Sequence, residues 1–257
     1  MGGTTEASAL ADALAEQGDC ATLSYAGRVA QPGAQPITVR IGGFGGVPGL
    51  AHYLQSNEVT HVVDATHPFA ARMSCHAVAA CEQVGVPLLA FTRDAWHPGH
   101  GDHWQSVADL PSAATALSGP PKRVMLAVGR MHLATFTCQP QHHYILRLVD
   151  EPDGLPPLPH HTTIVARGPF DVAGDIALLR KHRVNIVVCK NAGGSGAQAK
   201  LHAARTLGLP VLMVRRPLMP ARQEVTCVAD VLKWLQRTHG CEPVAHLSTS
   251  RGAERGV

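Results

Sequence analysis

The sequence has few aromatic residues, no long hydrophobic run and no strong excess of either charge. Aromatic residues make up 4% of the 257 positions and charged residues 16%. No apolar stretch reaches the ~18 residues that a membrane span requires, and the first residues lack the pattern of a signal peptide, so we expect none. The net charge of +3 includes no basic run, which argues against nucleic acid as a partner. We therefore expect a globular cytoplasmic protein without membrane contact, whose mild positive charge suits a small acidic ligand.

Paired cysteines are also lacking. The seven cysteines are odd in number and include no C-x-x-C pair. Several lie in apolar segments such as IVVCK, which is typical of reduced thiols in a core. The loop HPGHGDH brings three histidines close in sequence, but its glycine-rich spacing is weak evidence for a ligand set, so we expect no metal site. The adjacent pairs His142–His143 and His160–His161 are interpreted as surface residues.

Strand-like and helix-like segments alternate along most of the chain. Apolar runs such as THVVDAT, PLLAFT, RVMLAVG and NIVVCK are typical of parallel strands covered on both faces. Helical patterns follow several of them, including one that starts at PFAARM with Pro68 in its first turn. The alternation predicts an α/β protein with two Rossmann-like domains, mainly parallel sheets and an active-site cleft between the domains. With SGPPK as the connection, the domains are expected at 1–118 (cofactor-binding) and 119–240, followed by a disordered tail at 241–257.

The first residues, MGGTTEA, resemble a phosphate-binding turn. Gly2 and Gly3 allow backbone N–H groups to approach an oxyanion, while Thr4 and Thr5 can cap the following helix or contact phosphate. A purely structural turn is the alternative. Such a turn normally follows a β-strand, and no strand precedes it in this sequence. We expect a central strand to be missing, and therefore that the chain as given folds poorly or binds its cofactor weakly.

Arg28 follows the next expected strand, in the segment YAGR. A Rossmann fold that selects NAD usually has an acidic residue at this place. An arginine suits a 2′-phosphate, so the sequence favours NADPH, although a solvated loop arginine is the alternative.

The segment VVDATHPFA places three polar residues at the end of a buried strand. Polar side chains there are costly unless they are paired or functional, and this end of an open sheet is where ligands bind. We expect Asp64 and His67 to be catalytic and Thr66 to contact the cofactor; simple capping of the next helix is the alternative. His67 is the expected proton donor because the ordinary pKa of histidine lies near working pH, with solvent or Asp64 as other sources.

Cationic and glycine residues also follow strands in the second half of the chain. VARGPF and VVCKNAGGSG each place a positive side chain before a helix or glycine loop, which is a favourable anion site. Because parallel strands share one carboxyl edge, we expect these groups to meet. The expected substrate-binding residues are Arg130, Arg167, Lys190, Asn191, Gly193, Gly194, Arg215 and Arg216.

Taken in order, these motifs resemble a known family. GGTTEA, YAGR, GGFGG, DATHPFA, VGR, ARGPF, KNAGG followed by Lys200, and VRRP occur in the order found in precorrin-6A reductases of cobalamin biosynthesis. The resemblance covers roughly residues 2–217. It implies NADPH-dependent reduction of one double bond of the precorrin-6A macrocycle, giving precorrin-6B, with cofactor and tetrapyrrole bound between two Rossmann-like domains.

The sequence departs from this family at two places. Ala192 stands where the family usually has serine, and family members have a short apolar strand before the GGT turn. Two alternatives remain open, namely a cobalt-precorrin-6A reductase of the anaerobic pathway and a non-catalytic NADP-binding sensor. A short-chain dehydrogenase is excluded, because none of the three tyrosines is followed by a lysine four positions later.

Overall fold

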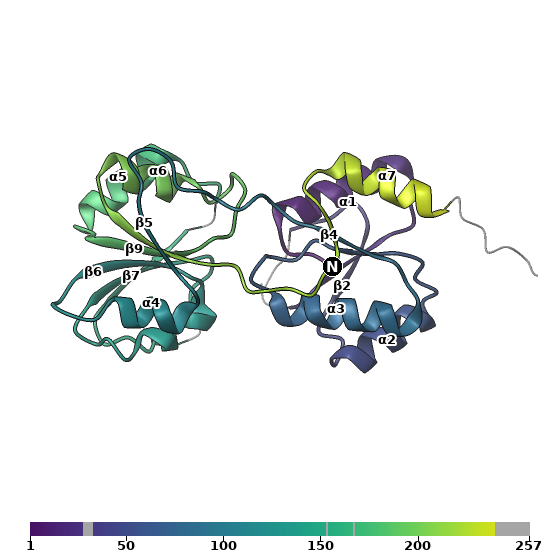
Figure 1. The fold of residues 1–257 in the computed structure, drawn as a ribbon, viewed down its shortest axis with the longest axis horizontal. Coiled ribbons are helices and arrows are strands. Elements are labelled where there is room, and N and C mark those ends of the chain that lie inside the picture. The colour runs from purple at the N-terminus through teal and green to yellow at the C-terminus, as the bar shows by residue number, and fades with distance from the viewer. Residues whose placement is uncertain (28–32, 153, 167, 240–257) are drawn as a thin grey trace, which may run out of the picture.

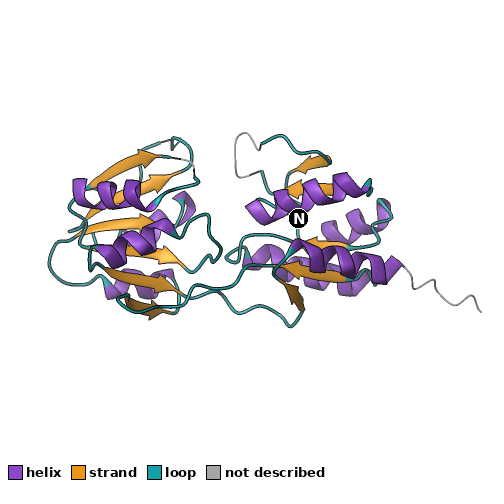
Figure 2. Ribbon diagram, turned by 90° about the horizontal axis from the view of Figure 1, so that it is seen from above, coloured by secondary structure: helices purple, strands orange, loops and turns teal. Residues whose placement is uncertain are grey.

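The computed structural model describes residues 1–27, 33–152, 154–166 and 168–239. These residues form two α/β lobes that are joined by two separate segments of chain (Figures 1 and 2). No helix in these ranges is both long and apolar enough to cross a bilayer.

The first lobe contains both ends of the described chain. It has a two-stranded sheet, β1–β2, and a three-stranded sheet in the order β11–β4–β3, and all the strand pairs are parallel. Its elements are α1 (Thr5–Gln17), β1 (Thr22–Tyr25), β2 (Thr38–Ile41), α2 (Val47–Ser56), β3 (Val62–Asp64), α3 (Ala71–Val84), β4 (Leu88–Phe91), β11 (Gln223–Val225) and α7 (Val228–His239).

Helices cover both faces of the first lobe. α1 and α7 pack together on one face, and α2 and α3 pack together on the other (Figure 1). Leu10 and Leu14 of α1 join Trp234 of α7 in one apolar cluster, while Leu50 and Leu54 of α2 lie in a second cluster. The sheet residues are therefore buried between two helical layers, which explains their continuous apolar runs.

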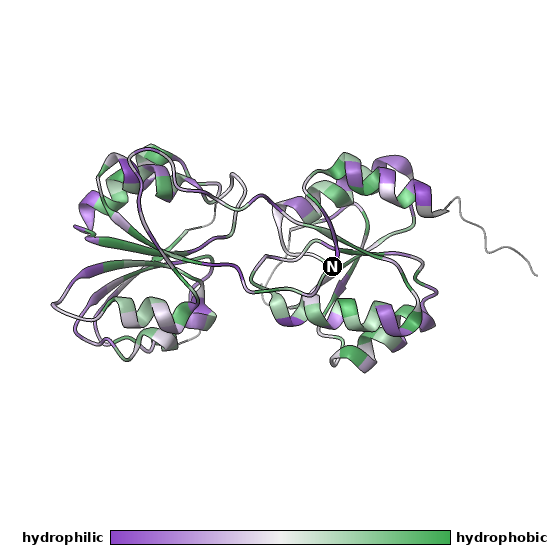
Figure 3. Ribbon diagram, in the orientation of Figure 1, coloured by the Kyte–Doolittle hydropathy of each residue, from purple (hydrophilic) through white to green (hydrophobic). Residues whose placement is uncertain are grey.

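The second lobe is a single six-stranded sheet with helices on both faces. Its strand order is β5–β10–β9–β6–β7–β8, and every pair is parallel. The strands at its centre are the most hydrophobic part of the lobe (Figure 3). Its elements are β5 (His103–Val107), α4 (Leu110–Ala116), β6 (Arg123–Ala127), η1 (Arg130–Phe136), β7 (His143–Leu148), β8 (His161–Val165), α5 (Val172–Lys181), β9 (Ile186–Lys190), α6 (Ala199–Thr206) and β10 (Pro210–Val214).

The predicted fold class is confirmed, but the predicted domain boundaries at 1–118 and 119–240 are wrong. β5 and α4 lie before residue 118 and yet belong to the second lobe, while β11 and α7 return to the first. The apolar face of α7 explains this return, because Val231 and Trp234 complete the core of the first lobe. The chain thus crosses between lobes at 92–102 and 215–222, and SGPPK connects α4 to β6 within the second lobe. The tail predicted at 241–257 lies outside the described residues.

Two local predictions also differ from the structure. The helix expected from Pro68 begins at Ala71, because His67 accepts the N–H groups of Phe69 and Ala70 and forms a turn before it. His142, expected on the surface, is fully buried. Its ring accepts the N–H of Lys122 and lies 2.8 Å from the carbonyl oxygen of Leu117, so a buried polar group is satisfied by the backbone.

Candidate active site

The strand order of the second lobe identifies where a ligand should bind. β6 and β9 are neighbours, but the chain leaves β6 toward β7 and leaves β9 toward β10 on the opposite side. Ligands of open parallel sheets bind outside the carboxyl ends of strands at such a switch point. Here those ends lead into Gly129–Arg130 and Lys190–Asn191. Of the sequence-predicted cations, Arg130 therefore follows one strand of the switch point and Lys190 is the last residue of the other.

The first lobe reaches this region through Phe69 and Glu6. Phe69 packs against the core of the second lobe, and the ammonium of Lys190 lies 5.3 Å from the centre of its ring. Glu6, in the first turn of α1, forms a 2.6 Å ion pair with Arg93, which follows β4. Arg93 also donates to the carbonyl oxygen of Gly193 at 3.4 Å. The start of α1, the turn after β3 and the glycine loop after β9 consequently meet at one place.

His67 lies at this meeting point in a strongly positive environment. Burial is the main cause that lowers its pKa to about 4, and Arg93, Lys190, Arg216 and Lys200 lower it further. Nδ1 accepts the N–H of Phe69 at 3.1 Å, so the proton of the neutral ring is on Nε2. The prediction that His67 titrates near working pH is therefore wrong for this environment. At neutral pH the ring is an uncharged hydrogen-bond donor.

Asp64, the other predicted catalytic residue, has both carboxylate oxygens occupied. Oδ1 accepts the N–H and the hydroxyl of Thr66, at 3.1 and 2.7 Å, and Oδ2 forms a 2.9 Å ion pair with Arg222. Its side chain is 1% exposed. Through this ion pair, Asp64 at the end of β3 holds the segment before β11, along which the chain returns from the second lobe. No pattern in the sequence indicates Arg222 as the partner, because it lies 158 positions away.

In the turn predicted to bind the cofactor, Gly2 and Thr4 have structural roles, whereas Gly3 leaves space for a ligand. Gly2 is required by packing, since a Cβ there would lie 2.6 Å from Cδ1 of Leu23. Thr4 caps α1 by accepting the N–H of Ala7, and its hydroxyl donates to the carbonyl oxygen of Ala65. Gly3, by contrast, has φ of +114° and open space where a Cβ would be. Its backbone and the first N–H groups of α1 suit an anion, because these groups lie outside the helical hydrogen-bond ladder.

The other two predicted cofactor hydroxyls form hydrogen bonds within the protein. Thr5 donates to Glu6 at 3.0 Å, and Thr66 donates to Asp64. Arg28 lies outside the described residues.

The glycine loop after β9 is docked on the crossing segment 92–102. The amide of Asn191 accepts the N–H of Trp96 at 2.8 Å and donates to its carbonyl oxygen at 2.9 Å. A Cβ on Gly193 would lie 2.2 Å from the carbonyl oxygen of Asp94, and one on Gly194 would lie 2.9 Å from Cδ of Arg93. The docking of the loop on this segment therefore explains Asn191, Gly193 and Gly194 without a ligand.

Several positively charged side chains surround this loop. Arg216 donates to the carbonyl oxygens of Asn191 and Ala192, at 3.1 and 3.3 Å, and burial lowers its pKa. Lys200 is buried with its ammonium 4.8 Å from the centre of the Trp96 ring, and burial lowers its pKa as well. Together with Lys190 and Arg93 they form a cationic cluster around His67. Arg93 was missed by the sequence reasoning, although it follows a strand end as the others do.

The remaining predicted cations lie apart from this cluster. Arg130 begins η1 and Arg215 follows β10, both with exposed side chains, and neither is among the described groups that act on the pKa of His67. Arg167 lies outside the described residues. Exposed apolar residues occur next to the carboxyl ends of β6, β7 and β8, namely Met131, Val149 and Val165, which are 69%, 52% and 41% exposed.

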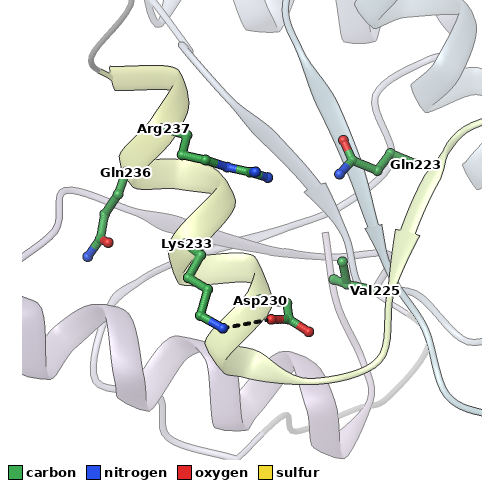
Figure 4. Close-up of a pocket in the computed structure, with 6 residues that line it drawn as sticks. All are labelled: Gln223, Val225, Asp230, Lys233, Gln236 and Arg237. Carbon is green, nitrogen blue, oxygen red and sulfur yellow. Dashed lines mark hydrogen bonds and ion pairs between the residues drawn. The ribbon is translucent and has the colours of Figure 1, made fainter.

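A separate hollow lies between β11 and α7 (Figure 4). Its volume is about 480 Å³, and Gln223, Val225, Asp230, Lys233, Gln236 and Arg237 line it. None of the predicted site residues that the structure describes is among them. The charges of this hollow are partly satisfied internally, because Lys233 pairs with Asp230 at 3.2 Å.

Comparisons with known proteins agree with the resemblance seen in the motifs. The family model of precorrin-6x reductase CbiJ/CobK matches residues 1–236. A precorrin-6A reductase of Rhodobacter capsulatus is 56% identical over 243 residues, which cover 95% of this chain and 96% of that protein. One from Rhodococcus erythropolis is 46% identical and covers 91% and 95%. A solved structure of CobK precorrin-6A reductase superimposes with a TM-score of 0.89 at 56% identity, covering 94% of this chain and 96% of that one. The chain therefore belongs to the precorrin-6x reductase family.

Proposed function

We propose that this protein reduces one double bond of the precorrin-6A macrocycle with NADPH, giving precorrin-6B in cobalamin (vitamin B12) biosynthesis. Family membership supports the reaction class. The observation that carries the proposal on this chain is the cationic cluster of Arg93, Lys190, Lys200 and Arg216 around His67, where the strand ends of both lobes meet. A substrate with many carboxylates requires such a cluster.

The residues at the start of α1 fit a dinucleotide. Gly3 leaves room above its backbone, and the first turn of α1 presents N–H groups and the positive end of the helix. The carboxylate of Glu6 in that turn is neutralised by Arg93, so it does not oppose a phosphate. Arg28, three positions after the end of β1, is the residue proposed to select the 2′-phosphate and hence NADPH over NADH. The bound nicotinamide supplies the hydride.

The second lobe is proposed to hold the tetrapyrrole. Lys190 and Arg216 neutralise its carboxylates, and Arg130, Arg167 and Arg215, which follow β6, β8 and β10 of the same sheet in the sequence, are further partners. Met131, Val149 and Val165 offer exposed apolar surface at the ends of three adjacent strands. A flat ring with charged edges suits a surface of this composition.

His67 is proposed to act first as a neutral donor and then as the proton source. Before binding, burial and, to a lesser degree, four cations keep the ring uncharged, with Nε2 carrying the proton. Carboxylates of the substrate would offset those cations and raise the pKa of His67 toward its ordinary value. The imidazolium formed in this way can then protonate the carbon next to the one that accepts the hydride. Asp64 positions the strand end rather than exchanging a proton, because Thr66 and Arg222 occupy its oxygens.

The direct test is anaerobic incubation with precorrin-6A and NADPH, followed through loss of the NADPH absorbance and the change in pigment spectrum. Parallel reactions with NADH and with cobalt-precorrin-6A distinguish the cofactor and the metallated substrate. Cofactor binding without turnover of either pigment would refute the proposal and indicate an NADP-binding sensor.

The cofactor assignment has its own test in Arg28→Ala. We expect KM for NADPH to rise at least ~10-fold while KM for NADH changes little, since a charged contact to phosphate contributes about 1.5–3 kcal/mol. Arg180→Ala, on the exposed part of α5, is the matched control and should leave both values unchanged. An equal effect on NADH and NADPH would contradict the role of Arg28.

A further inference from the structure

Arg40, near the end of β2, is a half-buried positive charge that the proposed function does not use. Its guanidinium donates to the carbonyl oxygens of Gly42 and Gly43, at 2.6 and 2.9 Å, and to the hydroxyl of Ser24 at 3.3 Å. All three acceptors are uncharged, and no carboxylate of the described residues pairs with Arg40. Three of its five N–H groups make these bonds, and the other two have no hydrogen-bond partner among the described residues.

Two aromatic rings help to hold this guanidinium in place. Its central carbon lies 3.8 Å from the centre of the Phe44 ring and 5.2 Å from the centre of the Tyr53 ring. The two rings also contact each other edge to face, with their centres 5.1 Å apart. The guanidinium is therefore oriented by carbonyl groups and rings rather than by a carboxylate. An arginine that is oriented but not neutralised is pre-organised to bind an anion.

The position of Arg40 relates it to the turn at Gly2–Gly3. Arg40 is paired with Ser24 in the parallel ladder between β1 and β2. The carbonyl oxygen of Ser24 accepts the N–H of Gly2 at 3.0 Å, while its hydroxyl accepts an N–H of Arg40. The turn and the guanidinium thus lie on opposite sides of β1. Dinucleotide-binding folds hold the ribose about 20 residues beyond the glycine turn, which here is the end of β1.

The chain that leads to Arg28 passes beside the loop after β2. Gly27, directly before Arg28 in the sequence, lies so close to this loop that a Cβ on it would be 3.6 Å from Cγ2 of Ile41 and 4.0 Å from the nitrogen of Gly42. Gly42 in turn donates its N–H to the carbonyl oxygen of Tyr25, the last residue of β1, at 2.9 Å. The loop after β1 and the loop after β2 are therefore in contact at one edge of the sheet.

Gly43 is a glycine that the fold does not require. Its φ lies outside the left-handed range, and a Cβ on it would meet no atom within 4 Å apart from its chain neighbours. Gly42 and Gly45, by contrast, have φ of +126° and +80°, so their backbone conformation favours glycine. The missing side chain at Gly43 leaves open space next to the guanidinium of Arg40, which is bonded to the Gly43 carbonyl oxygen.

We propose that Arg40 binds the 2′-phosphate of the dinucleotide together with Arg28, and that this phosphate lies against Gly43. The proposal rests on the proposed function, because it adds a specificity-determining residue to the cofactor site. A phosphate monoester has about two negative charges at neutral pH and three acceptor oxygens, which suits two arginines better than one. NADH has a hydroxyl in place of this phosphate and gains little from the second charge. Arg40 therefore contributes to the choice of NADPH over NADH.

The test measures the dissociation constants of NADPH and NADH for the parent chain and for the variants Arg40→Met, Arg40→Lys and Gly43→Ala. Arg72→Met is the matched control for the arginine, since Arg72 is exposed on α3 in the same lobe. Gly154→Ala is the matched control for the glycine, because a Cβ on Gly154 also has open space and its φ is not left-handed. The melting temperature of each chain is recorded without cofactor.

We expect Arg40→Met to weaken NADPH binding roughly 10-fold and NADH binding less than ~2-fold, since a charge-assisted bond to phosphate is lost. Arg40→Lys keeps the charge but not the planar fork, so its NADPH affinity should lie between those of the parent chain and Arg40→Met. Gly43→Ala should keep the parent melting temperature and still weaken NADPH binding at least ~5-fold, because the new methyl group meets the phosphate. Both controls should bind the two cofactors as the parent chain does.

Equal losses for NADPH and NADH in Arg40→Met, or parent-like NADPH binding in Gly43→Ala, would overturn the role of Arg40 while leaving the proposed function intact. A parent chain that binds NADPH no more tightly than NADH would refute the cofactor assignment, and the role of Arg40 with it. A measurement on the parent chain covers variants that fold poorly. In its NMR spectrum, adenosine 2′,5′-bisphosphate should shift the amide signals of Gly42 and Gly43 more than adenosine 5′-monophosphate does. Equal shifts with both nucleotides would overturn the proposal whatever the variants do.

Discussion

The lowered pKa of His67 makes a quantitative prediction about stability against pH. The ordinary value is 6.5 and the value in the fold is about 4, a difference that corresponds to about 3 kcal/mol. Below pH 6.5 the unfolded chain takes up a proton that the folded chain does not bind until the pH approaches 4. The folded state therefore loses about 3 kcal/mol between those two values and none above pH 6.5.

His67→Asn removes this titration while keeping an acceptor for the N–H of Phe69. We expect the free energy of unfolding of the parent chain, measured in urea, to fall by about 3 kcal/mol more than that of the variant between about pH 7 and about pH 4. His100→Asn, at an exposed loop position, is the matched control and should follow the parent chain. NMR titration of the His67 ring gives the pKa directly and, with a polycarboxylate such as citrate added, should show it rising.

Two results would refute this reasoning. One is a His67 ring that titrates near 6.5 in the folded chain, which would show that burial and the four cations do not control it. The other is an equal pH dependence of stability in the parent chain and in His67→Asn. Either result would also remove the proposed coupling between substrate charge and proton supply.

The remaining predictions concern contacts that hold the site together. Gly193→Ala should lower the free energy of unfolding, measured in a urea titration, by about 2–5 kcal/mol, because φ at Gly193 is +71° and the new Cβ would clash with a carbonyl oxygen. Gly196→Ala is the control: a Cβ at Gly196 has open space around it, so this change should have little effect in the same titration. Arg222→Ala leaves Asp64 buried without its ion partner and should cost about 3–5 kcal/mol; Asp64→Asn in the same chain should recover part of that loss, and no recovery would show that the charge is not the cause. Phe69→Ala should lower stability by about 3–5 kcal/mol and split the calorimetric transition in two as the lobes uncouple, while a single transition at lower temperature would contradict the bridging role.

The sequence predicted the fold class because the fold class depends on local patterns, and the same patterns indicate where a candidate site should lie. Apolar runs such as IVVCK identify buried parallel strands, and polar residues such as Lys190 mark their carboxyl ends. The domain boundaries were not predictable in this way, since β11 pairs with β4 only after the whole second lobe has intervened. Likewise, the partner of Asp64 is Arg222, 158 positions away, and no spacing rule connects them.

The roles of individual residues in the candidate site were harder to predict than the fold. The glycines of KNAGG have the composition of an anion-binding loop, yet their close packing against 92–102 is what requires them. The proton-donor role given to His67 relied on an ordinary pKa, which is lowered mainly by burial and further by cations from four separate segments. Residue type and spacing therefore indicate a candidate site, but burial and long-range charge decide what its residues do.

The chain passes between the lobes twice, and this affects the order in which the lobes can fold during translation. The second lobe is one uninterrupted stretch, from β5 to β10, whereas the first lobe needs β11 and α7 from near the end of the described chain. During translation the first ~100 residues emerge without their edge strand and without the helix that covers Leu10 and Leu89. The inserted lobe is thus the first that can finish folding on the ribosome, and the lobe that begins the chain is the last.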